Sequence, residues 1–202
     1  LYLRELKTLV DGVIPVLLSQ VVNGDNATEL FGSAAPTTKT DAVSKSVVHM
    51  GVALEKLRMA HHKAPVSDIR RLASWGHGVV PIYHKYLDAW RLGFQDLVVN
   101  LAPAVGSPED EDSLIGAMPR NESGDIIDST GERVDVAHLL KRPVLRLKQM
   151  AKFFKCVDSI IATNDTYDLL RDFEDLQEKA RRRHREEMAR LTDEDAINTD
   201  TT

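Results

Sequence analysis

The chain has 202 residues, a length that fits a single domain with its own buried core. Its formal net charge of −5 argues against general binding to nucleic acids, and its single cysteine excludes an internal disulfide. No apolar run approaches the roughly 20 residues that span a bilayer, and charged residues interrupt the first apolar segment. We therefore expect a soluble, cytoplasmic domain. Because Leu1 already lies in a predicted helix, we also expect the chain to be a fragment with a truncated N-terminus.

The spacing of apolar residues predicts helices along most of the chain. Apolar residues recur three, four and seven positions apart, whereas alternation with a period of two never persists. The first predicted helix covers about 1–22, and Gly12 and Pro15 should kink it, because proline removes a backbone donor and clashes with the preceding turn. The second covers about 40–62 and ends at the segment KAPVSD.

A third helical region is predicted from Ser67 to about Leu101, with an interruption at the segment WGHGVVP. Residues 104–135 differ in kind, because they hold nine acidic and two basic side chains together with many turn-forming residues. A loop of this length inside a compact domain is usually functional or disordered. Within it, the segment DIIDSTGER could form a short hairpin.

A long helix is predicted over 136–161 and a last helix over about 165–191. The first carries an apolar stripe along its whole length, and Asp165 is expected to be the N-cap of the second, which should fray at its end. The predicted fold class is all-α, an elongated bundle of long helices with an acidic loop insertion at 104–135. All of it is expected to form one domain, 1–202.

Sequence motifs for catalysis or for bound cofactors are missing. No glycine motif for phosphates, dinucleotides or hydrolase nucleophiles occurs, and neither the seven histidines nor Cys156 has metal-ligand spacing. The acidic run 109–112 lacks the spaced ligands of a calcium loop, so a solvated loop is the better interpretation. We therefore predict no catalytic residue, no cofactor and no metal ion.

The helix predicted over 136–161 has an unusually basic first part. Residues 136–155 hold six lysine or arginine side chains and no acid, in a chain that is acidic overall. At about 100° per residue, the face opposite the apolar stripe is mostly polar, but it carries Leu145, with Phe153 at its margin. This face is either a solvated helix surface or a docking surface with an apolar contact ringed by basic groups. The pattern alone favours neither interpretation.

Four segments resemble a known family. LLKRPVLRLKQMAKFF resembles the third conserved region of Dbl-homology domains, the guanine-nucleotide exchange domains for Rho-family GTPases. Pro143 and Arg146 match the proline and the arginine of that region, and Arg142 stands at its lysine. LYLRELKTLVDGVIPVL resembles the first conserved region, while LFG and VVPIYHKYLDAW resemble the second region and the central helix. The four segments follow the family's order over nearly the whole chain.

The resemblance implies a function that needs no catalytic acid, base or metal. Domains of this family dock on the two switch regions of a Rho-family GTPase and bind its nucleotide-free form most tightly, which speeds GDP release. The GTPase-binding residues implied for this chain lie in the basic helix and near the end of the last helix. They are Arg142, Leu145, Arg146, Lys148, Gln149, Lys152 and Arg185.

Two positions depart from the family pattern. The third region usually carries a glutamine and a lysine one helical turn apart, and both contact the GTPase. Here these positions hold Leu145 and Gln149, so the charge would have to come from Lys148 or Lys152. If it does not, the domain keeps the fold without the activity, as a helical scaffold that binds a GTPase or a septin-type partner. A helical interaction domain outside this family is the third alternative.

The acidic insertion resembles that of fungal bud-site-selection landmark proteins, which are septin-associated scaffolds with a divergent Dbl-homology domain. This finer resemblance implies a role in cell polarity at the cell cortex, the bud neck or the septum. The insertion is either a solvated loop or a segment whose acids fold onto the basic face of 136–155 and block it. A blocking contact between exposed charges would weaken as salt rises.

Overall fold

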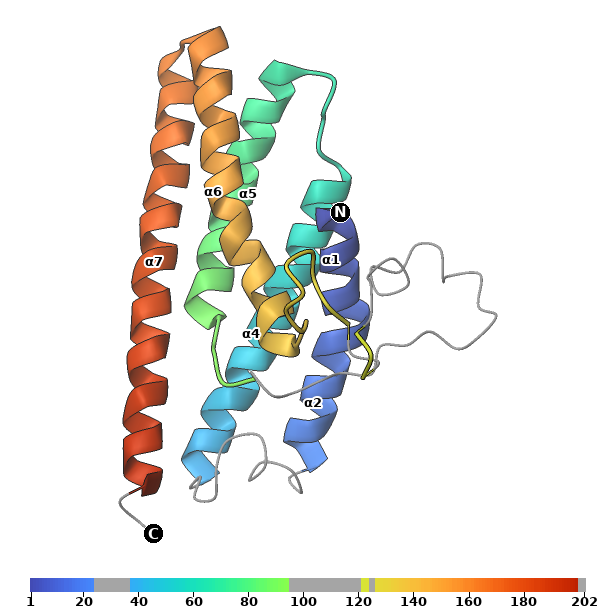
Figure 1. Cartoon of the computed structure of the whole chain (residues 1–202). Helices are drawn as coiled ribbons and strands as arrows, with labels where there is room; N and C mark the ends of the chain where they lie inside the picture. The colour runs from blue at the N-terminus through green and yellow to red at the C-terminus, as the bar shows by residue number, and fades with distance from the viewer. Residues whose placement is uncertain (24–36, 95–120, 124–125, 200–202) are drawn as a thin grey trace.

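The computed structural model describes residues 1–23, 37–94, 121–123 and 126–199, and within these ranges the chain is helical with no β-strand. The helices are α1 (Tyr2–Thr8), the π-helical segment η1 (Leu9–Val13), α2 (Ile14–Asn23), α4 (Thr37–His62), α5 (Ile69–Ala89), α6 (Val136–Ile161) and α7 (Asn164–Thr199). Figure 1 shows an elongated bundle in which α5, α6 and α7 lie side by side and α4 joins them to α1 and α2. The predicted all-α fold class is confirmed.

The first helix changes to π-helical geometry in its middle. At the end of η1, the backbone N–H of Ile14 donates to the carbonyl of Leu9, five residues earlier. Pro15 follows directly, and in a regular α-helix its ring would clash with the carbonyl four residues before it. A π-helical turn is one way to relieve that clash. The disturbance predicted around Pro15 is therefore a local change of hydrogen bonding within a continuous helical segment.

The second and third helices agree only in part with the predictions. α4 matches the second predicted helix and ends before the segment KAPVSD, after which Asp68 caps α5 by accepting hydrogen bonds from two backbone N–H groups. α5 then runs unbroken through Pro81 to Ala89, so the interruption predicted at WGHGVVP is wrong. Its continuation beyond Ala89 is also wrong for 90–94, which are not helical, while 95–101 lie outside the described residues.

The C-terminal end of α5 is held by side chains of α7. Arg183 donates hydrogen bonds to the backbone carbonyls of Leu87 and Trp90, at 3.0 and 2.8 Å. Carbonyls at a helix end have no partner within the helix, so these bonds satisfy them. Glu187 accepts a hydrogen bond from the backbone N–H of Leu92 at 3.0 Å. These contacts come from a distant part of the chain, and they explain why α5 ends earlier than its local pattern indicates.

α6 spans the predicted range, and Asp135 caps it by accepting a hydrogen bond from a backbone N–H of its first turn. Just before the cap, Ile127 and Arg133 form an isolated antiparallel bridge, which confirms the short hairpin predicted in this segment. The rest of the acidic insertion, 104–120 and 124–125, lies outside the described residues. The same holds for the acidic run and for the LFG segment, so the predictions made for them stay predictions.

The last helix begins and ends at other residues than predicted. Thr163 caps α7, because its hydroxyl oxygen accepts a hydrogen bond from the backbone N–H of Thr166 at 3.2 Å. The prediction of Asp165 as N-cap is wrong; this residue lies in the first turn, with its carboxylate 2.9 Å from the imidazole of His77. α7 continues past the predicted end to Thr199.

The core is formed mainly by α4, α5 and α6, with apolar side chains from α1, η1, α2 and α7 completing it. The apolar stripe of α6 is buried as predicted, apart from the half-buried Ile161. Phe154 of α6 stacks on Phe173 of α7, with ring centroids 4.8 Å apart. None of the described helices combines the length and the apolarity that a membrane-spanning segment requires.

Candidate functional site

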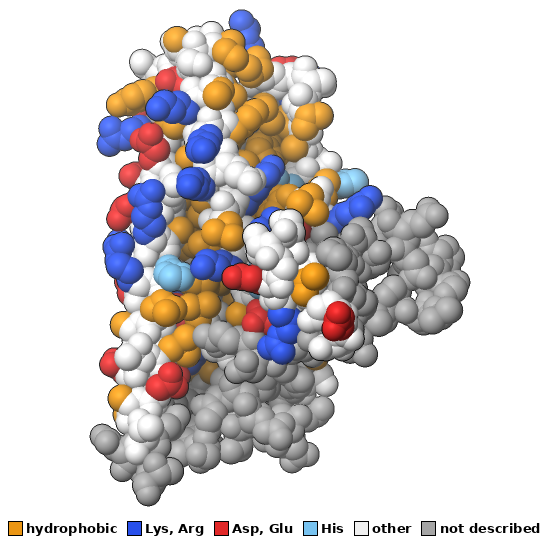
Figure 2. Space-filling view, in the orientation of Figure 1, with side chains coloured by type: hydrophobic (Ala, Val, Ile, Leu, Met, Phe, Trp, Pro, Cys, Tyr) orange, Lys and Arg blue, Asp and Glu red, His pale blue; other side chains and the backbone are white. Residues whose placement is uncertain are grey.

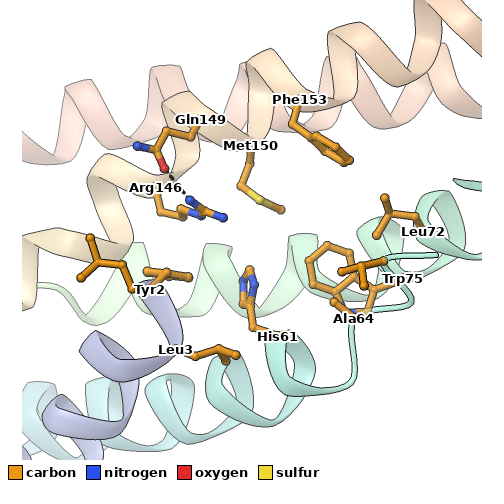
Figure 3. A pocket seen from close by; sticks show the side chains of 12 residues that line it. Tyr2, Leu3, His61, Ala64, Leu72, Trp75, Arg146, Gln149, Met150 and Phe153 are labelled. Atoms are coloured by element: carbon orange, nitrogen blue, oxygen red, sulfur yellow. Dashed lines mark hydrogen bonds between the residues drawn. The ribbon is translucent and has the colours of Figure 1, made fainter. Parts of the chain in front are cut away.

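A pocket of about 590 Å³ opens between the middle of α6, the start of α1, the end of α4 and the first turns of α5 (Figure 3). Most of its lining is apolar, with a few polar groups. The lining residues are Leu1, Tyr2, Leu3, His61, Ala64, Val66, Leu72, Trp75, Arg146, Gln149, Met150 and Phe153. A smaller pocket of about 160 Å³ adjoins it and adds Glu5, Arg142 and Leu145. We call the residues of these two pockets the α1–α6 face.

Apolar side chains on the α1–α6 face are open to solvent. Leu145 is 47% exposed and Phe153 is 43% exposed, although both project from a helix whose opposite side is in the core. Figure 2 shows hydrophobic side chains gathered between α6 and the upper parts of α4 and α5, with lysine and arginine side chains along α6 and α7 beside them. An apolar centre with a charged border is typical of protein-binding surfaces.

Arg146 links α6 to α1 at the floor of the larger pocket. Its guanidinium lies over the ring of Tyr2, with 5.0 Å between the central carbon and the ring centroid, a distance that suits a cation–π interaction. It also donates a hydrogen bond to the side-chain oxygen of Gln149, one turn along α6. Tyr2 is buried, Arg146 is half-buried and Gln149 is exposed, so these contacts run from the core to the open mouth of the pocket (Figure 3).

A buried chain of hydrogen-bonded polar side chains lies beneath Arg146. The hydroxyl groups of Tyr2 and Tyr83 lie 2.9 Å apart, and the Tyr83 hydroxyl is also 2.9 Å from Nε2 of His61. Burial lowers the pKa of His61 to about 4, and the nearby charge of Arg146 adds to this effect. His61 is therefore neutral near pH 7. The chain connects α1, α4 and α5, so it fixes the orientation of the Tyr2 ring under Arg146.

Arg142 forms an ion pair that connects α6 to α1. Its guanidinium contacts one carboxylate oxygen of Glu5 through two nitrogens, at 2.7 and 2.8 Å. The Glu5 side chain is only 6% exposed, whereas that of Arg142 is 31% exposed, so the carboxylate is buried and the guanidinium reaches the surface. Breaking a buried ion pair on one side leaves a charge without compensation, which is strongly unfavourable. The structure thus gives Arg142 a role in holding α1 against α6.

The other predicted site residues lie outside the two pockets. Lys148 and Lys152 are exposed on α6, and neither has an ion-pair partner within the described part of the chain. Arg185 lies on α7, where its side chain is 67% exposed and 3.9 Å from Glu178. The structure therefore brings Arg142, Leu145, Arg146 and Gln149 together on one face. The remaining three lie beyond the pocket lining.

Several lining residues were not identified from the sequence, among them His61, Leu72 and Trp75. They come from α4 and α5, and the sequence does not show that these helices border the pocket. One signal was present for His61, because it lies four residues after the buried Leu57 and so on the apolar side of its helix. A polar residue at such a position calls for a buried partner, which Tyr83 supplies.

The matching family model describes the DBL homology domain (DH-domain), and it covers residues 1–184. This range holds the whole α1–α6 face, every described helix up to α6 and the first half of α7. No curated protein and no solved structure matches the chain. Since the family model matches most of the chain, the chain belongs to the DBL homology domain family.

Proposed function

We propose that this domain docks on the two switch regions of a Rho-family small GTPase through its α1–α6 face and accelerates the release of GDP. The family indicates Rho-type guanine-nucleotide exchange in general terms. The observation that supports the proposed surface is the pocket itself. The helix that resembles the third conserved region contributes Leu145, Arg146 and Gln149 to an open apolar site, and the helix that resembles the first region forms its other wall.

The composition of this face suits a protein partner. Leu145 and Phe153 offer apolar surface that a partner would bury, at about 25 cal/mol per Å² removed from water. Arg146 and Gln149 add hydrogen-bonding groups beside it, and Lys148 offers an exposed charge close by on the same helix. Arginine and aromatic residues dominate the binding energy of protein interfaces.

The proposed acceleration arises from differential binding. An exchange factor stabilises the nucleotide-free GTPase more than the GDP-bound form, so it lowers the barrier to GDP release without donating a proton or an electron pair. Only the difference between the two affinities counts, because equal binding to both forms shifts no equilibrium. A rigid surface helps here, and the Tyr2–Tyr83–His61 hydrogen bonds together with the Glu5–Arg142 pair make this one rigid.

A second candidate function is that of a helical scaffold that binds a GTPase, or a septin-type partner, without accelerating exchange. Leu145 and Gln149 replace the glutamine and the lysine that the family pattern carries. Arg146 is also already engaged by Tyr2 and Gln149 within the domain. Exchange activity therefore requires that Arg146 changes partners on docking, or that Lys148 or Lys152 supplies the missing charge.

We also propose a cellular location and a domain organisation for this function. The resemblance of the acidic insertion to that of fungal bud-site-selection landmark proteins supports a cytoplasmic role at the cell cortex, the bud neck or the septum, with septin-associated partners. We further propose that the chain is one domain with an insertion at 104–135, because the described helices on either side of it share a single core.

Affinities for two nucleotide states distinguish the two functions. Each member of a panel of Rho-family GTPases would be titrated with this domain, once without nucleotide and once loaded with GDP. An exchange factor should bind one nucleotide-free GTPase on the order of 100-fold more tightly, or about 2.7 kcal/mol. A scaffold that binds a GTPase should bind both forms equally, and absence of binding to every member would contradict exchange and leave a scaffold for a septin-type partner alone.

Two variants of the domain would locate the surface in the same titration. Arg146→Glu/Gln149→Glu should lose the binding, since it reverses the charge of the pocket floor. Lys155→Glu/Arg171→Glu makes two charge reversals at exposed positions outside the α1–α6 face, so it should bind like the unmodified domain.

A further inference from the structure

The outer side of α4 exposes apolar side chains that do not contribute to the core. Val48, Val52 and Met59 are 44%, 51% and 49% exposed. At about 100° per residue they fall on one side of the helix, within a sector of roughly 40°. The inner side of α4 packs against α1, α2 and α5. These three side chains form a stripe that points away from the bundle.

A row of lysines runs directly beside this stripe. Lys45 and Lys56 of α4 are exposed on one side of the helix, and the exposed Lys63, directly after the last residue of α4, continues the row at the same helical spacing. The row therefore extends about 27 Å along the helix axis, at about 1.5 Å per residue. Between residues 42 and 63 the only acid is Glu55, and Arg58 binds its carboxylate at 2.8 and 2.9 Å. We call the stripe and the lysine row together the α4 face.

Two shallow pockets of about 510 Å³ each extend the α4 face toward its neighbouring helices. The first adds Arg4 and Lys7 of α1 next to Met59 and Lys63. The second adds Lys85 of α5, together with apolar side-chain atoms. Each pocket thus combines a positively charged border with apolar atoms.

The second pocket also holds the carboxylate of Asp88. This group is bound by Lys179 of α7, with Nζ and an oxygen 2.5 Å apart, so its charge is compensated. Near the first pocket, Asp11 of η1 interacts electrostatically with Arg58, which Glu55 also binds. Among the side chains that the structure describes, cations therefore outnumber acids on the α4 face.

We propose that the α4 face binds the surface of a membrane that contains anionic lipids. Its lysines would lie among the lipid headgroups, and Val48, Val52 and Met59 would reach the boundary with the acyl chains. Surfaces that combine a basic row with an apolar stripe bind in this way, and their affinity rises with the anionic lipid content. This inference does not rest on the proposed exchange activity, because the lysine row lies outside the α1–α6 face.

The residue types favour a lipid surface over an acidic protein as the partner. Lysine is a strongly hydrated point charge on a flexible stem, which suits many dispersed anionic headgroups, whereas arginine forms the planar, two-pronged contacts typical of protein interfaces. Lysine is depleted and aromatic residues are enriched in protein interfaces. The row on α4 is made of lysines alone, and its apolar stripe holds no aromatic side chain.

Vesicle co-sedimentation of the 202-residue chain tests this inference. Vesicles of phosphatidylcholine with phosphatidylserine should bind the protein at low salt, and vesicles of phosphatidylcholine alone should not. Binding should weaken as salt rises. One lysine near an anionic surface accounts for about a fivefold change in partitioning, equivalent to about 1 kcal/mol. The variant Lys45→Glu/Lys56→Glu/Lys63→Glu should therefore lose at least about 100-fold.

A matched variant separates a specific face from general electrostatics. Lys155→Glu/Arg171→Glu/Arg182→Glu changes the net charge by the same amount at exposed positions of α6 and α7, and it should partition within about threefold of the unmodified protein. A second pair, Val52→Ser/Met59→Ser, should weaken binding while keeping its salt dependence. Circular dichroism would verify that all variants fold.

Three outcomes would overturn the inference. The first is absence of binding to the anionic vesicles by the unmodified protein. The second is an equal loss in the matched variant, which would show that net charge alone decides. The third is binding of an acidic protein partner through the three lysines without any binding to vesicles, which would make this face a protein interface. Exchange on a soluble, unlipidated GTPase should be unchanged in the lysine variant, so this test and that of exchange stay separate.

Discussion

Gly76 allows α5 to approach the other helices closely. A Cβ atom at this position would lie 2.7 Å from the ring of Phe154 and 2.8 Å from Leu169, and both of these side chains belong to the buried core. Gly78, two residues later, faces open space, with no atom within 4 Å of the same added carbon. The segment WGHGVVP was predicted to interrupt the helix, whereas the first of its glycines serves packing.

Substituting alanine at these two glycines should change the free energy of unfolding in opposite directions. Gly76→Ala is expected to lower the free energy of unfolding by about 1–3 kcal/mol, because the core must shift to admit the methyl group. Gly78→Ala should raise it by about 0.5–1 kcal/mol, since glycine is a poor helix former and the site has room. Urea unfolding of the two variants measures both values. If both substitutions changed the free energy of unfolding in the same direction, α5 would not pack against α6 and α7 as described.

His61 should make the stability of the domain depend on pH. Burial holds its folded pKa at about 4, against 6.5 in the unfolded chain. Between these values the unfolded chain binds more protons, so stability is full above about pH 6.5 and falls as the pH drops toward 4. At about 1.4 kcal/mol per pKa unit, the loss over this window is roughly 2–3 kcal/mol.

A variant isolates this contribution from the other titrating groups. The difference in unfolding free energy between the unmodified domain and His61→Gln, measured at pH 7 and again near pH 4.5, should shrink at the lower pH. A difference that stays constant would mean that the imidazole is not buried in the neutral form.

The single residues of the site show what a linear pattern can and cannot identify. Arg146 and Gln149 follow from the resemblance of one helix to a conserved region, because their spacing on that helix is local information. The cation–π contact of Arg146 with Tyr2 depends on α1 crossing α6, and the hydrogen bond of His61 to Tyr83 depends on α4 packing on α5. Contacts of this kind are set by the tertiary arrangement.

Among the helices, those with local start and stop signals were the best predicted. α6 has an unbroken apolar period and an aspartate immediately before it, so both of its ends follow from the sequence. α5 ends where Arg183 and Glu187 of α7 bind its last backbone groups, more than 90 residues away along the chain. No local pattern carries that information, and the predicted end of α5 was accordingly wrong.

Glu187 is the centre of this contact between α5 and α7. It is 6% exposed, it pairs with Arg183 and Arg190 at 3.2 and 2.8 Å, and it accepts the N–H of Leu92. Burial alone would raise the pKa of its carboxyl, but the hydrogen bonds from Arg190 and Leu92 outweigh it and the pKa is lowered. Its stabilising effect is therefore present above the carboxyl's unfolded pKa of about 4.5 and is lost as the pH falls below it.

Removing this carboxylate should loosen the end of α5. Glu187→Ala is expected to cost about 3 kcal/mol of unfolding free energy, since it removes a buried acceptor that two partly buried guanidinium groups and one backbone amide share. Glu178→Ala removes a carboxylate from exposed pairs on the same helix and should cost less than about 0.5 kcal/mol. Hydrogen exchange at the amides of 88–92 gives the local readout. Similar losses in the two variants would contradict a specific role of Glu187.

At the scale of the whole molecule, the bundle holds two surfaces of different character. The α1–α6 face has an apolar pocket with fixed polar groups, and the α4 face has a basic row beside a narrow apolar stripe. The all-α class followed from periodicity, and the family from four short segments in order. The shapes of the two surfaces could not be predicted from the sequence, because each surface is assembled from helices that are distant in sequence.

Fluorescent-GDP release from the preferred GTPase is the most direct test of the central claim. The unmodified domain should accelerate release of the nucleotide, and Arg146→Glu/Gln149→Glu should abolish the acceleration while remaining folded and helical by circular dichroism. Lys155→Glu/Arg171→Glu should accelerate release like the unmodified domain. If the folded domain accelerates release from no Rho-family GTPase, or if the Arg146→Glu/Gln149→Glu variant remains fully active, the α1–α6 face is not an exchange surface.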